Sequence, residues 1–237
     1  MPLPLPEKIE VKLAIVSEDT AKALSELGLS DPPKEERRIH FFDTGELALF
    51  DRGLILRVRQ TVAGGDADDA TLKVRGDGAA AAAERFLATA AGTAKFEGDQ
   101  NAGRDELLSF SITTRLSPAD SASVVAGGKP LESVLDDAGR TLLREIGGAA
   151  ADSIGIQSLG PIRSRSWKPK PAGFAGKITV ELWDVAGTPL LELSDKVPRA
   201  EAPALAAQLM KLIAEMGVHQ LDTSKTRFAL ERLRMIV

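Results

Sequence analysis

Charged side chains stand at every second residue in five short segments of this chain, and most of these charges are basic. The segments 8–12, 56–59, 71–75, 163–165 and 224–227 read KIEVK, LRVR, TLKVR, RSR and SKTR. Alternate side chains of a β-strand share one face, so each segment directs its charges one way and its apolar residues the other. Several such strands in a closed sheet would create a cationic interior. This pattern favours binding of a compact polyanion, such as a chain of phosphates.

The overall charge requires that this positive charge is local. The chain has 237 residues, 43% of them apolar and 27% charged, which is ordinary for a folded globular protein. Its net charge is −4, whereas a protein that coats nucleic acid usually shows a basic balance. We therefore expect a small anionic ligand and no nucleic-acid partner.

Several classes of site are excluded by residues that are scarce or missing. The sequence has no cysteine, which excludes disulfides, thiolate metal sites and a cysteine nucleophile. Its two histidines, His40 and His219, leave little room for a histidine-ligated metal. The first residues, 1–6, lack the basic region and apolar run of a signal peptide. No apolar stretch approaches the roughly 18–20 residues that cross a bilayer. We expect a cytoplasmic protein without membrane contact.

Hydrophobic periodicity predicts strands, then a helical middle, then strands again. The predicted strands are 7–16, 38–42, 46–50, 54–62, 70–75, 162–168, 176–184, 189–196 and 227–233. Helical periodicity predicts a helical insertion at about 103–150. An amphipathic helix is predicted over 203–216, with Gly217 as its C-terminal stop.

Two segments near the middle of the chain are ambiguous. The alanine run 79–83 favours a helix by propensity, whereas 85–91 fits a strand equally well. No linker or fixed-period repeat divides the chain, which predicts one domain over residues 1–237.

Five motifs in this order resemble the CYTH, or triphosphate tunnel metalloenzyme, superfamily. They are KIEVK at 8–12, FFDT at 41–44, LILRVR at 54–59, TLK at 71–73 and SK at 224–225. The resemblance runs from about residue 7 to residue 230. It implies an α+β fold, an eight-stranded antiparallel closed β-barrel enclosing a tunnel, with helices packed outside. It also implies a triphosphate ligand and Mg²⁺ or Mn²⁺ as cofactor.

The resemblance further implies roles for individual residues. The phosphate-clamping positions of the family match the predicted catalytic residues Lys12, Arg57, Arg59 and Lys73. Further substrate-binding residues are predicted to be Arg75, Arg85, Arg165, Lys225 and Arg227. The predicted metal ligands are Glu10, Asp184 and Glu192, with Glu181 as the alternative to Asp184. Cations inside a low-dielectric interior bind phosphates better than exposed cations do, and a carboxylate-held divalent ion polarises the phosphoryl group.

Departures from the family pattern leave two functions open. Lys8 stands where the family carries its first signature glutamate, and Glu192 is the only acidic residue of three alternating positions, 190, 192 and 194. One reading is a metal-dependent triphosphatase, with inorganic triphosphate as the favoured substrate and an adenylate cyclase-like enzyme as a variant. The other is a non-catalytic polyphosphate- or nucleotide-binding module. Two or more carboxylates converging inside the barrel would favour the enzyme.

Two smaller predictions concern the surroundings of the site. Asp43 is expected to tie a turn or neighbouring backbone and to take no part in chemistry. Pairing of two barrels through an outer face leaves a homodimer open.

Overall fold

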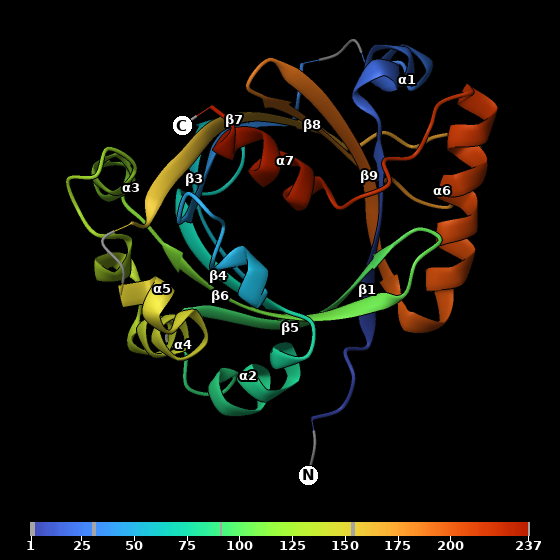
Figure 1. The fold of residues 1–237 in the computed structure, drawn as a ribbon. Helices are drawn as coiled ribbons and strands as arrows, with labels where there is room; N and C mark the ends of the chain where they lie inside the picture. The colour runs from blue at the N-terminus through green and yellow to red at the C-terminus, as the bar shows by residue number, and fades with distance from the viewer. Residues whose placement is uncertain (1–2, 30–31, 91, 153–154, 237) are drawn as a thin grey trace.

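The strands of the chain close into one barrel. The computed structural model describes residues 3–29, 32–90, 92–152 and 155–236, and within these ranges the order around the barrel is β1-β5-β6-β4-β3-β2-β7-β8-β9 (Figure 1). The strands are β1 (Lys8–Ile15), β2 (Glu35–Asp43), β3 (Leu54–Ala63), β4 (Asp69–Arg75), β5 (Thr93–Asn101), β6 (Glu106–Arg115), β7 (Gln157–Trp167), β8 (Thr179–Val185) and β9 (Thr188–Pro198).

The predicted closed barrel is confirmed, but its strand count and pairing differ from the prediction. The described residues form nine strands, and β1 runs parallel to β5 while every other neighbouring pair is antiparallel. An odd number of strands cannot close into a ring with all neighbours antiparallel. One parallel pair is therefore a geometric necessity of the ninth strand.

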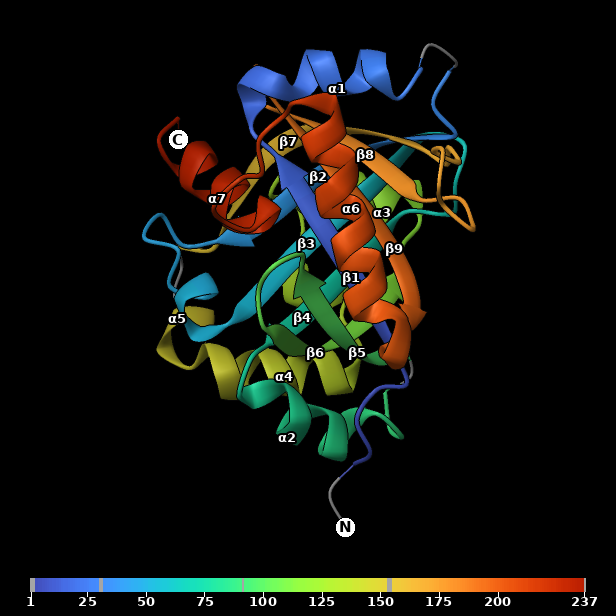
Figure 2. The same cartoon turned by 90° about the vertical axis from the view of Figure 1, so that its right-hand side faces the viewer.

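Helices surround the barrel. They are α1 (Thr20–Glu26), α2 (Gly78–Phe86), α3 (Pro118–Val125), α4 (Asp137–Gly147), α5 (Ala149–Asp152), α6 (Ala202–Met216) and α7 (Lys225–Arg234). Figure 1 looks along the barrel and shows α2, α4 and α6 outside its wall, whereas α7 lies across the opening. The perpendicular view in Figure 2 places α7 at one end of the barrel. No helix within the described ranges combines the length and apolar character required to span a membrane.

The hydrophobic core lies largely between the barrel wall and the outer helices. In β1, Ile9, Val11 and Leu13 are at most 3% exposed and belong to one apolar cluster with residues of α6. The alternate residues Glu10 and Lys12 line the barrel interior instead. The alternation of the sequence thus assigns one face of the strand to the core and the other to the cavity.

Several predicted elements are confirmed. Strands β3 and β4 form the expected hairpin, pairing Leu54 with Val74 and Arg59 with Asp69. Helix α6 ends at Gly217, whose φ of +61° is the left-handed conformation that glycine adopts readily. The three late strands predicted from residue 162 onward appear as β7, β8 and β9.

Two predicted strands are wrong, and the predicted helical insertion is confirmed only after residue 117, where α3 and α4 lie. Residues 46–50 form turns and the start of a 3₁₀ helix (Phe50–Arg52) instead of a strand, because the buried Asp43 carboxylate accepts hydrogen bonds from the backbone N–H groups of Thr44, Leu49 and Phe50. The expected helical insertion at 103–150 begins with strand β6, where Phe110 and Ile112 are buried on one face. The expected last strand is helix α7.

Helix α7 begins where the sequence was interpreted as a charged strand. The hydroxyl of Ser224 accepts a hydrogen bond from the Arg227 N–H at 3.2 Å, which is an N-terminal helix cap. The prediction that Asp43 serves a turn is confirmed by its three backbone hydrogen bonds.

Candidate functional site

The barrel encloses a cavity of about 730 Å³. Its wall consists of inward-facing side chains from most of the strands, together with the first turn of α7. Eleven basic and eight acidic side chains of the described residues line this barrel cavity, so basic groups outnumber acidic groups. The interior is therefore strongly charged, although the whole chain carries a net charge of −4.

Most of the predicted site residues line this cavity. Those brought together are Glu10, Lys12, Arg57, Arg59, Lys73, Arg75, Glu192, Lys225 and Arg227. They come from β1, β3, β4, β9 and α7, which are far apart in the sequence. Their placement agrees with the predicted roles, and the roles themselves stay predictions.

Three predicted residues do not line the cavity. Arg85 lies on α2, 58% exposed, and pairs with Glu145 at 2.5 Å because this segment is an outer helix and not a strand of the barrel. Arg165 is exposed on β7, where the alternate residue Ser164 is the one that bonds Glu181 inside. These two predictions are wrong.

The third residue outside the cavity is Asp184, the predicted metal ligand. It accepts a hydrogen bond from the Gly187 N–H at 2.7 Å in the turn between β8 and β9. Glu181 and Trp183 of the same strand line the cavity, so Asp184 has the opposite parity. Glu181, the alternative weighed at this strand, occupies the inner face.

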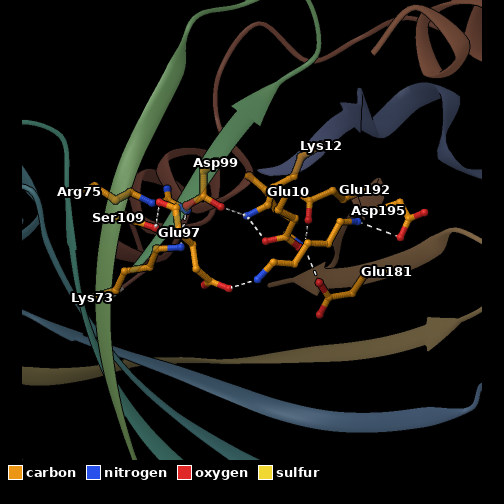
Figure 3. A network of polar contacts seen from close by, with 12 residues as sticks. Glu10, Lys12, Lys73, Arg75, Glu97, Asp99, Ser109, Glu181, Glu192 and Asp195 are labelled. Atoms are coloured by element: carbon orange, nitrogen blue, oxygen red, sulfur yellow. Dashed lines mark hydrogen bonds and ion pairs between the residues drawn. The ribbon is translucent and has the colours of Figure 1, made fainter. Parts of the chain in front are cut away.

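Asp99 of β5 lies at the centre of one group of cations. Its carboxylate oxygens lie 2.9 Å from Lys12 Nζ and 2.6 Å from Lys73 Nζ, with an Arg75 nitrogen at 3.8 Å (Figure 3). Burial alone would raise the pKa of Asp99, but these three cations hold it well below the usual range of an aspartate. Burial and the charge of Lys12 lower the pKa of Lys73 to about 8.

Lys225, at the start of α7, contacts a second group of charged side chains, the carboxylates of Glu181 and Glu192. Its ammonium lies 2.5 Å from Glu181 and 2.8 Å from Glu192, and its side chain is only 7% exposed. The same ammonium lies 4.2 Å from the centre of the Trp183 ring, within the range of a cation–π contact. Burial would raise the pKa of Glu181, but Lys225 lowers this pKa to about 2.

Asp69 of β4 contacts a third group of charged side chains, which are arginines from strands β2 and β3. Its carboxylate lies 2.8 Å from an Arg59 nitrogen and 3.5 Å from an Arg37 nitrogen. Arg37 also pairs with Glu35, and both residues line the cavity. Two arginines are thus held in fixed positions by shared carboxylates.

Arg57 is different from the cations in these three groups. It forms no ion pair with any carboxylate of the described ranges, and its Nε atom is buried without a hydrogen-bond partner. Burial and the charge of Arg59 lower the pKa of Arg57 to about 10, so it stays positive at neutral pH. A half-buried arginine that faces a cavity without a carboxylate partner is a candidate anion ligand, because such a charge is costly unless it is compensated.

The cavity-lining residues of β5 were not predicted from the sequence. Lys95, Glu97 and Asp99 all line the cavity, at alternate positions of one strand. Their spacing at every second residue is the signal of a strand with a charged face, but the mixed signs of the charges do not indicate a cationic surface. Arg37 of β2 and Lys196 of β9, which pairs with Glu97, also line the cavity and were not identified.

Lys8 does not lie where the motif comparison suggested. It shares the parity of Glu10 and Lys12 but is exposed and does not contribute to the cavity wall. Its ammonium therefore does not occupy a metal position between the carboxylates.

In two places of the cavity, a pair of carboxylates shares the ammonium of one lysine. Glu10 and Asp99 both contact Lys12, and Glu181 and Glu192 both contact Lys225. Within the described ranges, no group of three or more acidic, histidine or cysteine side chains could enclose a metal. Mg²⁺ commonly binds one or two carboxylates together with substrate phosphates. These residues therefore fit a divalent cation that also contacts phosphate.

Comparisons with known proteins support the fold. No protein-family model matches the chain, and no curated protein matches it in sequence. Among solved structures, HpAC1 from Hippeastrum superposes with a TM-score of 0.61 at 18% identity, covering 95% of this chain and 96% of that one. It is described as a proposed adenylyl cyclase with a dominant triphosphatase activity. A proposed adenylate cyclase from Bacillus halodurans gives a TM-score of 0.57 at 15% identity, covering 93% and 96%.

Proposed function

Since the chain has the barrel fold of the CYTH superfamily, we propose that it binds a triphosphate in the barrel cavity and hydrolyses it. The observation that carries this proposal is Arg57, a half-buried cation that faces the cavity without a carboxylate partner and with its Nε atom buried and unbonded. Inorganic triphosphate is the proposed substrate. The triphosphatase activity described for the Hippeastrum protein supports hydrolysis as the reaction.

The basic residues of the cavity would contact the phosphates, and the acidic residues would contact a metal ion. Arg57, Arg59, Lys73 and Arg75 approach from β3 and β4, and they would bind the phosphate oxygens and orient the chain of phosphates. The positions of Arg59, Lys73 and Arg75 are maintained by the carboxylates of Asp69 and Asp99, so this part of the site is arranged before the ligand enters.

We propose Mg²⁺ or Mn²⁺ as the cofactor. The carboxylates of Glu10 and Asp99, or those of Glu181 and Glu192, would hold it together with the phosphates. A bound divalent cation polarises a phosphoryl oxygen and lowers the pKa of a coordinated water. The convergence of Glu181 and Glu192 on one ammonium favours an enzyme over a module that has lost its carboxylates.

A non-catalytic polyphosphate- or nucleotide-binding module is the second candidate. The observation that favours it is that Lys12 and Lys225 already neutralise both carboxylate pairs. Turnover would be lost if neither lysine yields its carboxylates to a metal ion.

The decisive experiment measures phosphate release from inorganic triphosphate, ATP and thiamine triphosphate, each with Mg²⁺ or Mn²⁺. We expect release from inorganic triphosphate, and its loss in Arg57→Met. Arg85→Met is the matched control, since Arg85 lies outside the barrel. Binding without release would support the non-catalytic module, and conversion of ATP to cyclic AMP would support the cyclase variant. Absence of both binding and release would refute the proposed function.

A further inference from the structure

Asp99 contacts the cations that a phosphate would need. One of its carboxylate oxygens lies 2.9 Å from Lys12 Nζ on β1, and the other lies 2.6 Å from Lys73 Nζ and 3.8 Å from Arg75 on β4. The carboxylate therefore stands between two strands and bridges their cations, as Figure 3 shows. A phosphate group and a carboxylate are both anions with several acceptor oxygens, and they compete for the same donors.

Replacing Asp99 with a phosphate as the partner of these cations is unfavourable if no other ion binds at the same time. The side chain of Asp99 is 9% exposed, so a phosphate that took its cations would leave a buried carboxylate unpaired. Glu10 would lose the same partner, because it lies 3.0 Å from the Lys12 ammonium, although its side chain is 37% exposed and can be hydrated. A divalent cation that bound these two oxygen ligands would remove this cost, since carboxylate oxygens are the ligands that Mg²⁺ and Mn²⁺ accept.

We infer that Asp99 is a built-in competitor of the phosphate and couples the binding of triphosphate to the binding of a divalent cation. This inference rests on the proposed function. In the free protein Asp99 occupies Lys12, Lys73 and Arg75. On binding, the phosphates take these cations while the divalent cation takes Asp99 and Glu10. The true ligand is therefore the metal–triphosphate complex, and neither component alone binds strongly.

Two quantitative consequences follow for the wild-type protein. Triphosphate should bind at least about tenfold more tightly with Mg²⁺ than in EDTA, a modest coupling by the standards of linked sites. Mg²⁺ should gain the same factor in affinity for the protein when triphosphate is present, because the coupling between two given ligands is reciprocal. Both affinities can be measured by titration calorimetry without any turnover, with data from a slowly hydrolysed imido analogue of triphosphate if the enzyme is fast.

The test of Asp99 itself is the substitution Asp99→Asn, which keeps the size of the side chain and removes its charge. This variant should bind triphosphate in EDTA about tenfold more tightly than the wild type, and it should gain less from Mg²⁺. The matched control is Asp195→Asn. Asp195 borders the same cavity but pairs with no cation of the described ranges, and it accepts the Lys196 backbone N–H. The control should bind triphosphate as the wild type does.

The outcomes separate this inference from the proposed function. If the wild type binds triphosphate equally well in EDTA and in Mg²⁺, or Asp99→Asn binds no better in EDTA, then the inference is wrong and the proposed function stands. If both aspartate variants gain equally, a general charge effect explains the result and Asp99 has no special role. If Asp99→Asn does not fold, the reciprocal Mg²⁺ titration of the wild type, with and without triphosphate, decides whether the coupling exists. If triphosphate binds under no condition, the proposed function itself is wrong.

Discussion

The Lys225 ammonium lies 2.8 Å from a carboxylate oxygen of Glu192, and this contact ties the first residue of α7 to strand β9 inside the barrel. Both side chains are close to fully buried, at 7% and 11% exposed. The C-terminal helix is therefore anchored by an ion pair in the cavity as well as by the apolar contacts of Leu230 and Leu233.

Removing this anchor should destabilise the fold. Lys225→Met keeps most of the side-chain length but leaves Glu181 and Glu192 without their cation. We expect a loss of about 3 kcal/mol in the free energy of unfolding, as for other broken buried ion pairs. Urea unfolding measures this loss. Arg227→Met is the control, because its pair with Glu231 is half-exposed and should contribute less than about 1 kcal/mol. Equal effects of the two substitutions would contradict the anchoring role.

Arg57→Met should separate binding from stability. The wild-type protein carries the cost of burying an unpaired guanidinium, so the variant should unfold at the same or a higher urea concentration. Its affinity for triphosphate should fall by roughly ten- to a hundredfold, the equivalent of about 1.5–3 kcal/mol for a charged hydrogen bond. Calorimetry and urea unfolding of the same samples test both halves. A variant that binds normally would remove Arg57 from the site.

Triphosphate affinity should decline in alkaline solution. The pKa of Lys73 is about 8 in the free protein, and a bound phosphate would raise it. Binding above pH 8 must then take up a proton, so the affinity falls as pH rises through this value. Lys73→Arg should move the decline to higher pH, because arginine keeps its charge. Calorimetry from pH 6.5 to 9.5 tests this, and a flat profile for the wild type would contradict it.

Acid should destabilise the folded protein through its internal carboxylates. The pKa of Glu181 is lowered from 4.5 to about 2, so this ion pair contributes stability that is complete above about pH 5 and is lost as pH falls toward 2. Asp99 acts in the same direction. The urea concentration at the midpoint of unfolding, measured at pH 7, 5, 4 and 3, should fall only below pH 5. Glu181→Gln should flatten part of that decline, and an unchanged wild-type midpoint at pH 3 would exclude the effect.

The β3–β4 hairpin could be predicted from the sequence, since its apolar and basic residues alternate without interruption on both sides of a short loop. The alternation also placed Arg57, Arg59 and Lys73 on one face correctly. Strand periodicity and helix capping compete at residues 224–227, and the capping hydroxyl of Ser224 prevails. Lys225 lines the cavity from the first turn of α7, so its location was predicted although its secondary structure was not.

The pairing of opposite charges could not be predicted in the same way. Asp99 and Lys12 lie 87 residues apart in the sequence, and no local pattern indicates that they share a hydrogen bond. They meet because β1 runs beside β5, with Glu10 opposite Asp99 in the register. That parallel neighbour follows from the strand count, which depends on the whole chain. The positions of the cations were visible locally, whereas their counter-ions required the topology.

The position of β1 between β5 and β9 has a consequence for the newly made protein. All eight residues of β1 pair with β9, which ends at Pro198, so the first of the nine described strands must wait for the ninth. A ribosome adds about 5–20 residues per second, and the wait therefore lasts on the order of ten to forty seconds. During that time one edge of β1 has no partner strand, and it lies next to Ile9, Val11 and Leu13, which are buried in the folded protein. Such an exposed edge favours association between nascent chains. The wall of the barrel cavity is therefore complete only after β9 and the first turn of α7 have been synthesised.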